Sequence, residues 1–424
     1  MKASRLASLA GVLAMGVVAA ACGSSASSSS GSSGSSSSAG AAPAQITIGT
    51  TYSGSGSFAV SSLAELGGLK FWISHENGKG GVYVGAYKKR IPVKLVAYND
   101  QSDPATAGVL TNQLITQNHV NILTADFGSV LTAPAVSIAQ AHHMVLFDQS
   151  GTGIPFFTPS NPYIVLCNLP VSSIWPTVLS NFLIAKHINN VAILYGTNDF
   201  DASQATTLQS KLTKAGIKVA YYQGIPTSTT SYGTLLNTIH ATNPGAVLEL
   251  GYQPNDVAFL QAVQSSGLHF PMVFTVFPGQ LLSLFQQDVG TQGLAYTYTY
   301  ATNYFHNYTS VNEGMTTSQF LTQIAKAAPQ ANNTVGLLGY NTGLVIQAVL
   351  KQAKSLSQTD IRAAATAVSG HLNTLDGNFV INSEGAQIGE LLPLGQLVPS
   401  SGSAAMKVVY PSSQAQAQAV YPMP

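Results

Sequence analysis

Charged residues are scarce in this sequence. Asp, Glu, Lys and Arg make up only 8% of the 424 residues, against about a quarter in an average globular domain. No basic stripe is therefore available to bind nucleic acid, so nucleic acid is not among the partners that we expect. Few carboxylates need to be protonated as the pH falls, which predicts a surface that tolerates acidic surroundings.

Long apolar runs are also missing, apart from one at the N-terminus. Lys2 and Arg5 precede the uncharged residues 6–21, which are short for a membrane span and typical of the apolar part of an export signal. This run ends in Ala19-Ala20-Ala21-Cys22-Gly23, which resembles the lipobox of bacterial lipoproteins. The resemblance implies that residues 1–21 are a signal peptide and that a lipidated Cys22 anchors the protein outside the cytoplasm on the bacterial cell membrane. Plain secretory cleavage after Ala-x-Ala is the alternative.

Residues 22–44 are predicted to form a flexible tether. Residues 23–40 contain 12 Ser, and such a tract cannot bury a core. If Cys22 is lipidated, Cys167 has no cysteine with which to form an intramolecular disulfide, and we expect it to be a small buried apolar residue. The roughly 380 remaining residues exceed one ordinary core, which predicts two lobes.

Residues 121–153 predict the unit around which the chain is organised. Two short apolar strands flank a helix-length segment, and a polar, Gly-containing turn follows each strand. Ligands of open parallel sheets bind at the carboxyl ends of the strands, so we expect Ser129, Ser150 and Thr152 to converge on one crevice. Ser129 lies near a helix start, where free N–H groups favour an anion. The alternative is a pair of ordinary capped loops.

The remaining chain alternates strands with helices, which predicts an α/β fold with parallel sheets. A helix that begins after Asp103-Pro104 has an N-cap and a proline at its first position. We also expect a capping box at Asp201 and Gln204 and a turn-rich insertion at residues 80–90. Strands are expected at residues 46–51, 91–98, 191–195, 218–222, 246–250 and 272–276, and helices at 232–241, 254–266, 317–327, 335–353 and 359–368.

Residues 45–410 resemble the substrate-binding proteins of branched-chain amino acid ABC transporters, the leucine/isoleucine/valine-binding type. The motifs that carry the resemblance occur in order along the chain. They are Ser53-Gly54, Tyr98-Asn-Asp-Gln-Ser-Asp-Pro104, Gly128-Ser129 with Thr132-Ala-Pro134, Ser150-Gly-Thr152, Tyr195-Gly-Thr-Asn-Asp-Phe200, Gly224-Ile-Pro, Gly251-Tyr252-Gln-Pro254 and Gly267-Leu268.

This resemblance implies a type I periplasmic-binding-protein fold with two doubly wound parallel-sheet lobes joined by three crossovers. Lobe one would comprise residues 45–168 and 298–375, and lobe two residues 169–297 and 376–424. The protein would be a monomeric extracytoplasmic solute-binding component of an importer rather than an enzyme. It would close on a small molecule without a cofactor or a metal and deliver the ligand to a permease with its ATPase subunits.

The resemblance also implies roles for individual residues. Ser129, a backbone N–H near Thr152, and Tyr252 would hold a ligand carboxylate, while Ser150 and Thr152 would hold an ammonium together with an acid on lobe two. That acid falls near Phe277-Pro278-Gly279, where no carboxylate is present. A buried ammonium without a charged partner is costly, so either another acid substitutes or the ligand has no ammonium.

The acids that could substitute are Asp126, Glu249 and Asp199, although a capping or surface role is the favoured interpretation of each. Phe58 and Phe277 could instead line a pocket for an apolar or aromatic body. We therefore expect an amino acid or a related small organic acid or amide as the ligand.

Two other functions stay open at this point. A receptor module that presents its closed form to a signalling partner would have the same sequence features. Gly54-Ser-Gly56-Ser-Phe-Ala59 follows a strand and opens a helix, as in dinucleotide-binding oxidoreductases. The export signal and the insertion at residues 78–90 argue against that enzyme class.

Overall fold

A computed structural model describes residues 41–302 and 310–424. Cys22 and the tether through residue 40 lie outside the described residues. Within the described ranges, no helix has both the length and the apolar character needed to cross a membrane. The chain forms two large sheets, each flanked by helices, and we call each sheet with its helices a lobe.

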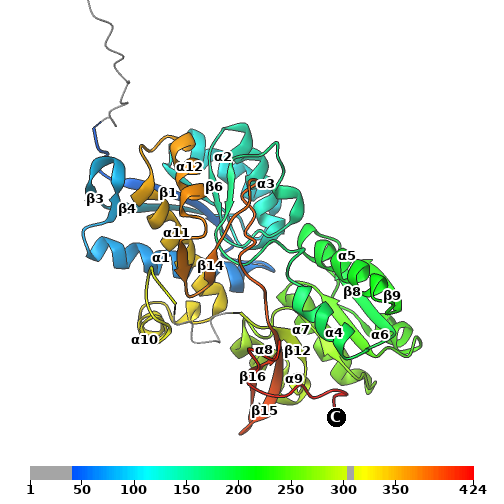
Figure 1. The fold of residues 1–424 in the computed structure, drawn as a ribbon. Coiled ribbons are helices and arrows are strands. Elements are labelled where there is room, and N and C mark those ends of the chain that lie inside the picture. The colour runs from blue at the N-terminus through cyan, green and yellow to red at the C-terminus, as the bar shows by residue number, and fades with distance from the viewer. Residues whose placement is uncertain (1–40, 303–309) are drawn as a thin grey trace, which may run out of the picture. The chain divides into compact units, whose positions relative to one another are not determined.

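The sheet of lobe one has five parallel strands (Figure 1). Strand β1 pairs with the edge strand β4 from Ile46 beside Val93 to Tyr52 beside Asn99. Because all five strands run the same way, their carboxyl ends share one edge, where ligands of such sheets bind. In spatial order the strands are β4 (Val93–Asn99), β1 (Ile46–Tyr52), β5 (Ile122–Thr124), β6 (Leu146–Asp148) and β7 (Ile164–Leu166).

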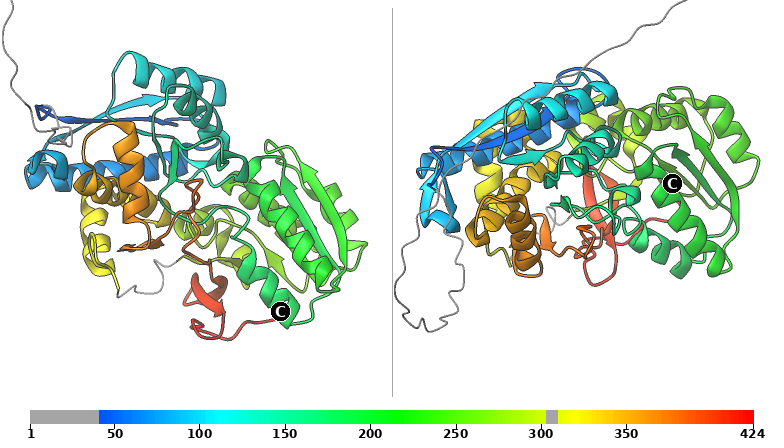
Figure 2. Two further views of the ribbon diagram at one scale, coloured as in Figure 1. Left: turned by 45° about the horizontal axis from the view of Figure 1, so that its top comes forward. Right: turned by 90° about the horizontal axis from the view of Figure 1, so that it is seen from above.

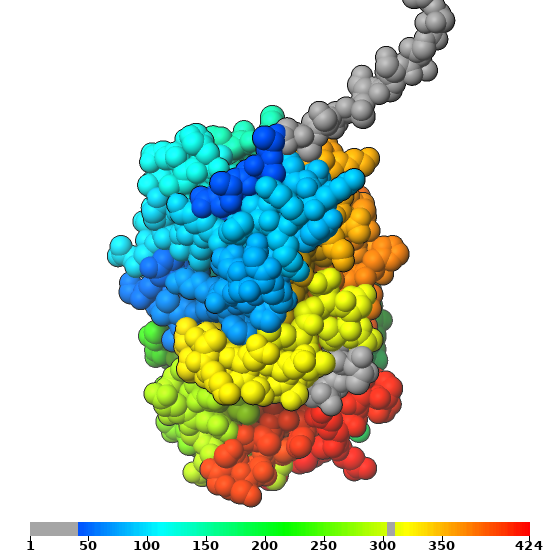
Figure 3. Space-filling view, turned by 90° about the vertical axis from the view of Figure 1, so that its left-hand side faces the viewer, coloured from blue at the N-terminus to red at the C-terminus, as the bar shows by residue number. Residues whose placement is uncertain are grey.

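Two glycine-rich helices of lobe one, α1 and α11, cross in direct backbone contact. A Cβ atom on Gly68 of α1 would lie 1.8 Å from the carbonyl oxygen of Gly336, so only glycine fits there. Figure 3 shows α1 in blue beside the yellow segment that contains α10. The helices of lobe one are α1 (Ala59–Gly78), α2 (Pro104–Thr116), α3 (Gly128–Ala141), α10 (Thr317–Ala327), α11 (Thr334–Gln352) and α12 (Gln358–Val368), with short 3-10 turns η1 (Gly85–Tyr87), η2 (Ile154–Phe156) and η4 (Pro329–Ala331).

The sheet of lobe two has seven strands, of which five are parallel and two form a C-terminal antiparallel hairpin. Figure 2 shows this hairpin in red. The spatial order is β16 (Ser403–Tyr410), β15 (Leu394–Ser400), β12 (Tyr298–Tyr300), β11 (Val273–Phe274), β10 (Ala246–Leu250), β8 (Val191–Gly196) and β9 (Val219–Ile225). Its helices are α4 (Thr177–Ala185), α5 (Asp199–Lys214), α6 (Gly233–His240), α7 (Gln253–Ser266), α8 (Leu282–Asp288) and α9 (Gly290–Leu294).

Two of the expected lobe boundaries differ from the boundaries that the strand pairing defines. Strand β12, at residues 298–300, pairs with β11 and β15 of lobe two rather than continuing into lobe one. The boundary expected at residue 376 falls inside a hairpin of β13 (Leu372–Thr374) and β14 (Gly377–Phe379). Both Leu372 and Phe379 pack in the core of lobe one, so the chain passes from lobe one to lobe two after this hairpin and not at residue 376.

Two local expectations were wrong. The insertion at residues 80–90 contains strands β2 (Val82–Val84) and β3 (Lys89–Ile91), which pair as a hairpin. Asn198 caps α5, because its side chain accepts from the N–H groups of Phe200 and Asp201. Asp201 is instead a fully buried residue in the first turn. The expected cap of α2 by Asp103 is confirmed.

Candidate functional site

The loops that follow β5 and β6 meet at the N-terminus of α3. Gly128, the first residue of this helix, has a φ of 79°, a conformation that side chains disfavour. A Cβ atom there would lie 2.9 Å from the ring of Tyr252. Glycine at this position therefore lets lobe two approach the helix start closely.

Hydrogen bonds bring Ser129, Ser150 and Tyr252 together at this helix start. The N–H of Gly128 donates to Ser150 Oγ at 3.1 Å, and the N–H of Ser129 donates to the Tyr252 hydroxyl at 2.9 Å. The N–H of Gly153 donates to Ser129 Oγ at 3.0 Å. Free N–H groups at a helix start form an anion site. The Tyr252 hydroxyl of lobe two occupies that position here.

Thr152 lies in the same loop but does not line the cavity at the site. Its carbonyl accepts hydrogen bonds of 2.8 Å from the Ser172 N–H and hydroxyl. Its own hydroxyl is buried and has no hydrogen-bond partner among the described residues. Buried hydroxyls are usually paired, so the Thr152 hydroxyl is a group that can still form a hydrogen bond.

Half of the residues that line the cavity are aromatic. The cavity volume is about 10 Å³, roughly enough for one water molecule, so the two lobes are nearly in contact here. The lining residues are Phe127, Gly128, Ser150, Leu169, Trp175, Phe200, Tyr252, Phe277, Gln280 and Leu338.

The aromatic rings of the wall contact one another. The Phe277 ring stacks on that of Tyr252, with centroids 6.0 Å apart, and Trp175 meets Phe200 edge-on at 4.9 Å. Phe58, expected to line the pocket, instead packs edge-on against Tyr252 at 5.0 Å and is not part of the cavity wall. The wall therefore has the chemistry to enclose an apolar or aromatic body.

Asp126 does not face the cavity. Its carboxylate accepts from the Phe127 N–H at 2.7 Å, from the Ser53 hydroxyl at 2.6 Å and from the Ser62 hydroxyl. Burial and the neighbouring charge of Asp100 raise its pKa to about 7. These bonds connect the loops of lobe one, and we assign Asp126 a structural role.

The other two candidate acids are also outside the cavity wall. Glu249 is fully buried in lobe two, where it lies with Asp201 and Asp256, and burial raises its pKa to about 7. Asp199 is exposed in the first turn of α5, with its Cβ beside Gly153 of lobe one. No carboxylate of the described residues lines the cavity.

Sequence reasoning did not select Phe127, Trp175, Phe200 or Gln280. Phe200 ends the motif Tyr195-Gly-Thr-Asn-Asp-Phe200 and Phe127 directly precedes Gly128-Ser129, so an aromatic residue in the loop after a strand was the available signal. Trp175 lies in the first crossover, and Gln280 follows Phe277 by three residues. Nothing in their spacing places these two beside Tyr252.

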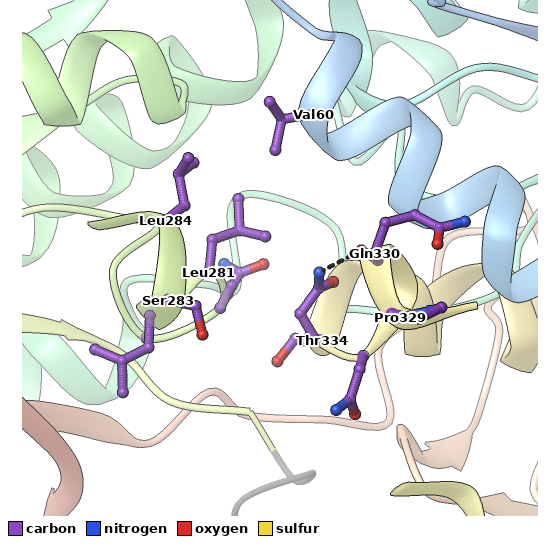
Figure 4. A pocket seen from close by; sticks show the side chains of 12 residues that line it. Val60, Leu281, Ser283, Leu284, Pro329, Gln330 and Thr334 are labelled. Atoms are coloured by element: carbon purple, nitrogen blue, oxygen red, sulfur yellow. Dashed lines mark hydrogen bonds between the residues drawn. The ribbon is translucent and has the colours of Figure 1, made fainter. Parts of the chain in front are cut away.

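A groove of about 310 Å³ adjoins the cavity and shares Gln280 with it. Figure 4 shows Val60 of α1 near Leu281 and Leu284 of lobe two, with Gln330 and Thr334 of lobe one nearby. Val60 is 48% exposed. Gln280 therefore lines both the groove and the smaller cavity.

The two lobes and the closed site between them are those of a bilobal binding protein. A family model described as periplasmic binding protein matches residues 45–403. The chain belongs to this family, and the resemblance to the leucine/isoleucine/valine-binding type is confirmed.

Relatives with described functions share this resemblance at low identity. A Leu/Ile/Val-binding protein of Citrobacter freundii is 24% identical over 215 residues, which cover 50% of this chain and 56% of the relative. The chain thus matches about half the length of such relatives. These relatives are binding proteins rather than enzymes.

Solved structures match over a longer range. A branched-chain amino acid transporter substrate-binding protein of Streptococcus pneumoniae, in complex with isoleucine, has a TM-score of 0.71 at 18% identity and covers 87% of this chain and 100% of its own. A solute-binding protein of an ABC transporter from R. palustris, in complex with benzoate, has a TM-score of 0.72 at 15% identity, with coverages of 85% and 95%. The type I periplasmic-binding-protein fold is confirmed.

Proposed function

We propose that this protein is the extracytoplasmic solute-binding component of an ABC importer, and that it captures a small molecule between its two closing lobes. The observation that carries the proposal is the closed cavity itself. Lobe one contributes Ser150 and the N-terminus of α3, and lobe two contributes Tyr252, Phe200 and Phe277. Closure around a ligand is the hinge motion expected of two lobes joined by crossovers.

The proposed ligand is a small organic acid or amide with an apolar or aromatic body. Hydroxyl and backbone N–H groups at α3 suit a carboxylate or carbonyl end. The rings of the wall suit the body, and no acid of the wall is available to hold an ammonium. The structural relatives crystallised with isoleucine and with benzoate make both amino acids and aromatic acids appropriate test compounds.

A thermal-shift screen of the purified protein tests this proposal. The compounds are Leu, Ile, Val, Phe, benzoate, 4-hydroxybenzoate and benzamide, with glucose and Zn²⁺ as controls. A ligand stabilises the native state by RT ln(1 + [L]/Kd), about 2.7 kcal/mol at 100 times Kd. We expect the ring-bearing acids or amides to raise the melting temperature most. Strong stabilisation by Leu, Ile and Val alone would refute the proposed ligand body, and stabilisation by the controls alone would refute the whole assignment.

We further propose that Cys22 carries the lipid that keeps the monomeric protein at the membrane, near the permease and its ATPase subunits. The lipobox-like sequence and the Ser-rich tether support this location. Labelled fatty acid should enter the wild-type protein in cells and not the Cys22→Ser variant, which should appear in the medium. Equal labelling of the two proteins would contradict lipidation at Cys22.

A further inference from the structure

Gln280 occupies a fixed position between the cavity and the groove. Its N–H donates to the carbonyl of Phe277 at 2.8 Å, within the turn that follows β11. Its carbonyl accepts from the N–H of Thr334, at the start of α11 in lobe one, at 3.4 Å. The backbone of Gln280 is therefore held from both lobes, and its side chain lies in the cavity wall.

The side-chain amide of Gln280 has a donor without a partner. The side chain is 3% exposed, and Nε2 makes no hydrogen bond with any described residue. A buried donor without a partner loses its hydrogen bonds to water and gains none in the protein, so buried polar groups in native structures are almost always paired. The stability of the unliganded protein therefore does not explain this amide, whereas a hydrogen bond to a ligand would.

The other polar groups of the cavity wall already have partners. Ser150 Oγ accepts from the Gly128 N–H, and the Tyr252 hydroxyl accepts from the Ser129 N–H. Among the described lining residues, Gln280 is the one with a buried side-chain nitrogen or oxygen that makes no hydrogen bond at all. A ligand oxygen that entered the cavity would therefore find this donor available.

We propose that Gln280 is a ligand-binding residue of lobe two, whose Nε2 donates a hydrogen bond to an acceptor oxygen of the ligand. This inference rests on the proposed function and adds to it a required chemical feature. The ligand must present an oxygen to lobe two as well as to the α3 end of lobe one. A ring-bearing acid with a hydroxyl, carbonyl or carboxylate oxygen fits, whereas a body that presents only hydrocarbon to lobe two leaves Nε2 unpaired.

Two substitutions of Gln280 test the role of its donor. Gln280→Leu removes the donor and keeps a side chain of similar size, and Gln280→Glu replaces the amide with an acceptor. We expect Gln280→Leu to weaken binding of the strongest ligand of the screen about 5- to 100-fold, as for one lost hydrogen bond, and Gln280→Glu to weaken it at least as much. Kd is measured by isothermal titration calorimetry. Gln287→Leu in α8 is the matched control, because Gln287 is exposed and outside the cavity wall.

The melting temperature of the unliganded variant separates binding from structure. Removal of an unpaired buried donor should leave it unchanged or raise it, whereas loss of a structural hydrogen bond would lower it. Unchanged Kd in both Gln280 variants, or a lowered melting temperature with a Kd change no larger than that of Gln287→Leu, would overturn the inference. In either case ligand binding by the wild type would still support the proposed function, whose own failure appears as no stabilisation by any acid or amide.

Discussion

The two lobes contribute opposite chemistry to the same cavity. Lobe one presents backbone N–H groups and hydroxyls around the start of α3, and these polar groups are paired with one another or with Tyr252. Lobe two presents Phe200, Tyr252 and Phe277, with Gln280 as its unpaired polar side chain. We propose from this difference that lobe one orients one polar end of the ligand, while lobe two encloses the body and meets a second ligand oxygen at Gln280.

Buried carboxyl groups lie behind the cavity in both lobes, yet they are arranged differently. In lobe one, Asp148 Oδ1 accepts from the N–H groups of Ser150 and Gly151, at 3.2 and 2.7 Å. In lobe two, Asp201, Glu249 and Asp256 lie together, and burial with mutual repulsion raises the pKa of Asp256 well above its usual range. Acids of both lobes thus hold protons near neutral pH; those of lobe one also accept hydrogen bonds that shape the loops after β5 and β6, whereas those of lobe two lie together in one buried group.

The largest effect that we expect is a loss of stability at high pH. The carboxyl pKa is raised by burial in both lobes, to about 8 for Asp148 and about 7 for Glu249. Between pH 4 and these values the native state binds more protons than the unfolded state, so the free energy of unfolding falls as pH rises. Melting temperatures measured from pH 5 to pH 8 should fall steadily, and a rise over this range would contradict the assignment.

The Asp148→Asn variant tests this explanation in lobe one. Asn can keep the Oδ1 acceptor for the two N–H groups while removing the titration. The stability difference between pH 5 and pH 8 should shrink by up to about 4 kcal/mol, because each pH unit is worth about 1.4 kcal/mol per group. Asp288→Asn, at an exposed acid of lobe two, is the control and should leave the pH profile as in the wild type.

Much of the fold could be predicted because local patterns and tertiary structure agree. The helix at 317–327 has the expected bounds, since Thr316 and Gln319 form a capping box and an apolar stripe follows. The buried face of α1 is harder to predict from its apolar residues, because Leu63 is 39% exposed while Gly67 and Gly68 are buried. Glycines let α11 contact α1 directly, and that contact, which no local pattern reveals, decides which face of α1 is buried.

The site was predicted less completely than the fold. Ser129 and Ser150 lie together because parallel strands bring the loops after β5 and β6 to one edge of the sheet, and Tyr252 of lobe two bonds to the Ser129 N–H; that they bind a ligand stays a prediction. Trp175 and Gln280 reach the cavity only through the packing of one lobe on the other, which sequence spacing does not encode. Asp126 was considered for a ligand role because it follows β5, yet its oxygens bond Ser53, Ser62 and Phe127.

The smallest effects are expected from hydroxyl deletions in lobe one, and they separate two kinds of hydroxyl. Ser129→Ala removes the acceptor of the Gly153 N–H, so it should weaken ligand binding several-fold and also lower the melting temperature of the unliganded protein. Thr152→Val removes a buried hydroxyl that has no partner among the described residues and keeps the shape of the side chain. It should therefore leave the unliganded melting temperature nearly unchanged. If the ligand supplies the missing partner, the variant should bind it several-fold or more weakly, because one buried hydrogen bond contributes about 1–3 kcal/mol. Thermal melts and calorimetric titrations of both variants measure the two effects separately. If Thr152→Val binds the ligand as tightly as the wild type does, its hydroxyl does not contact the ligand, and the polar end is held by α3, Ser129 and Ser150 without it.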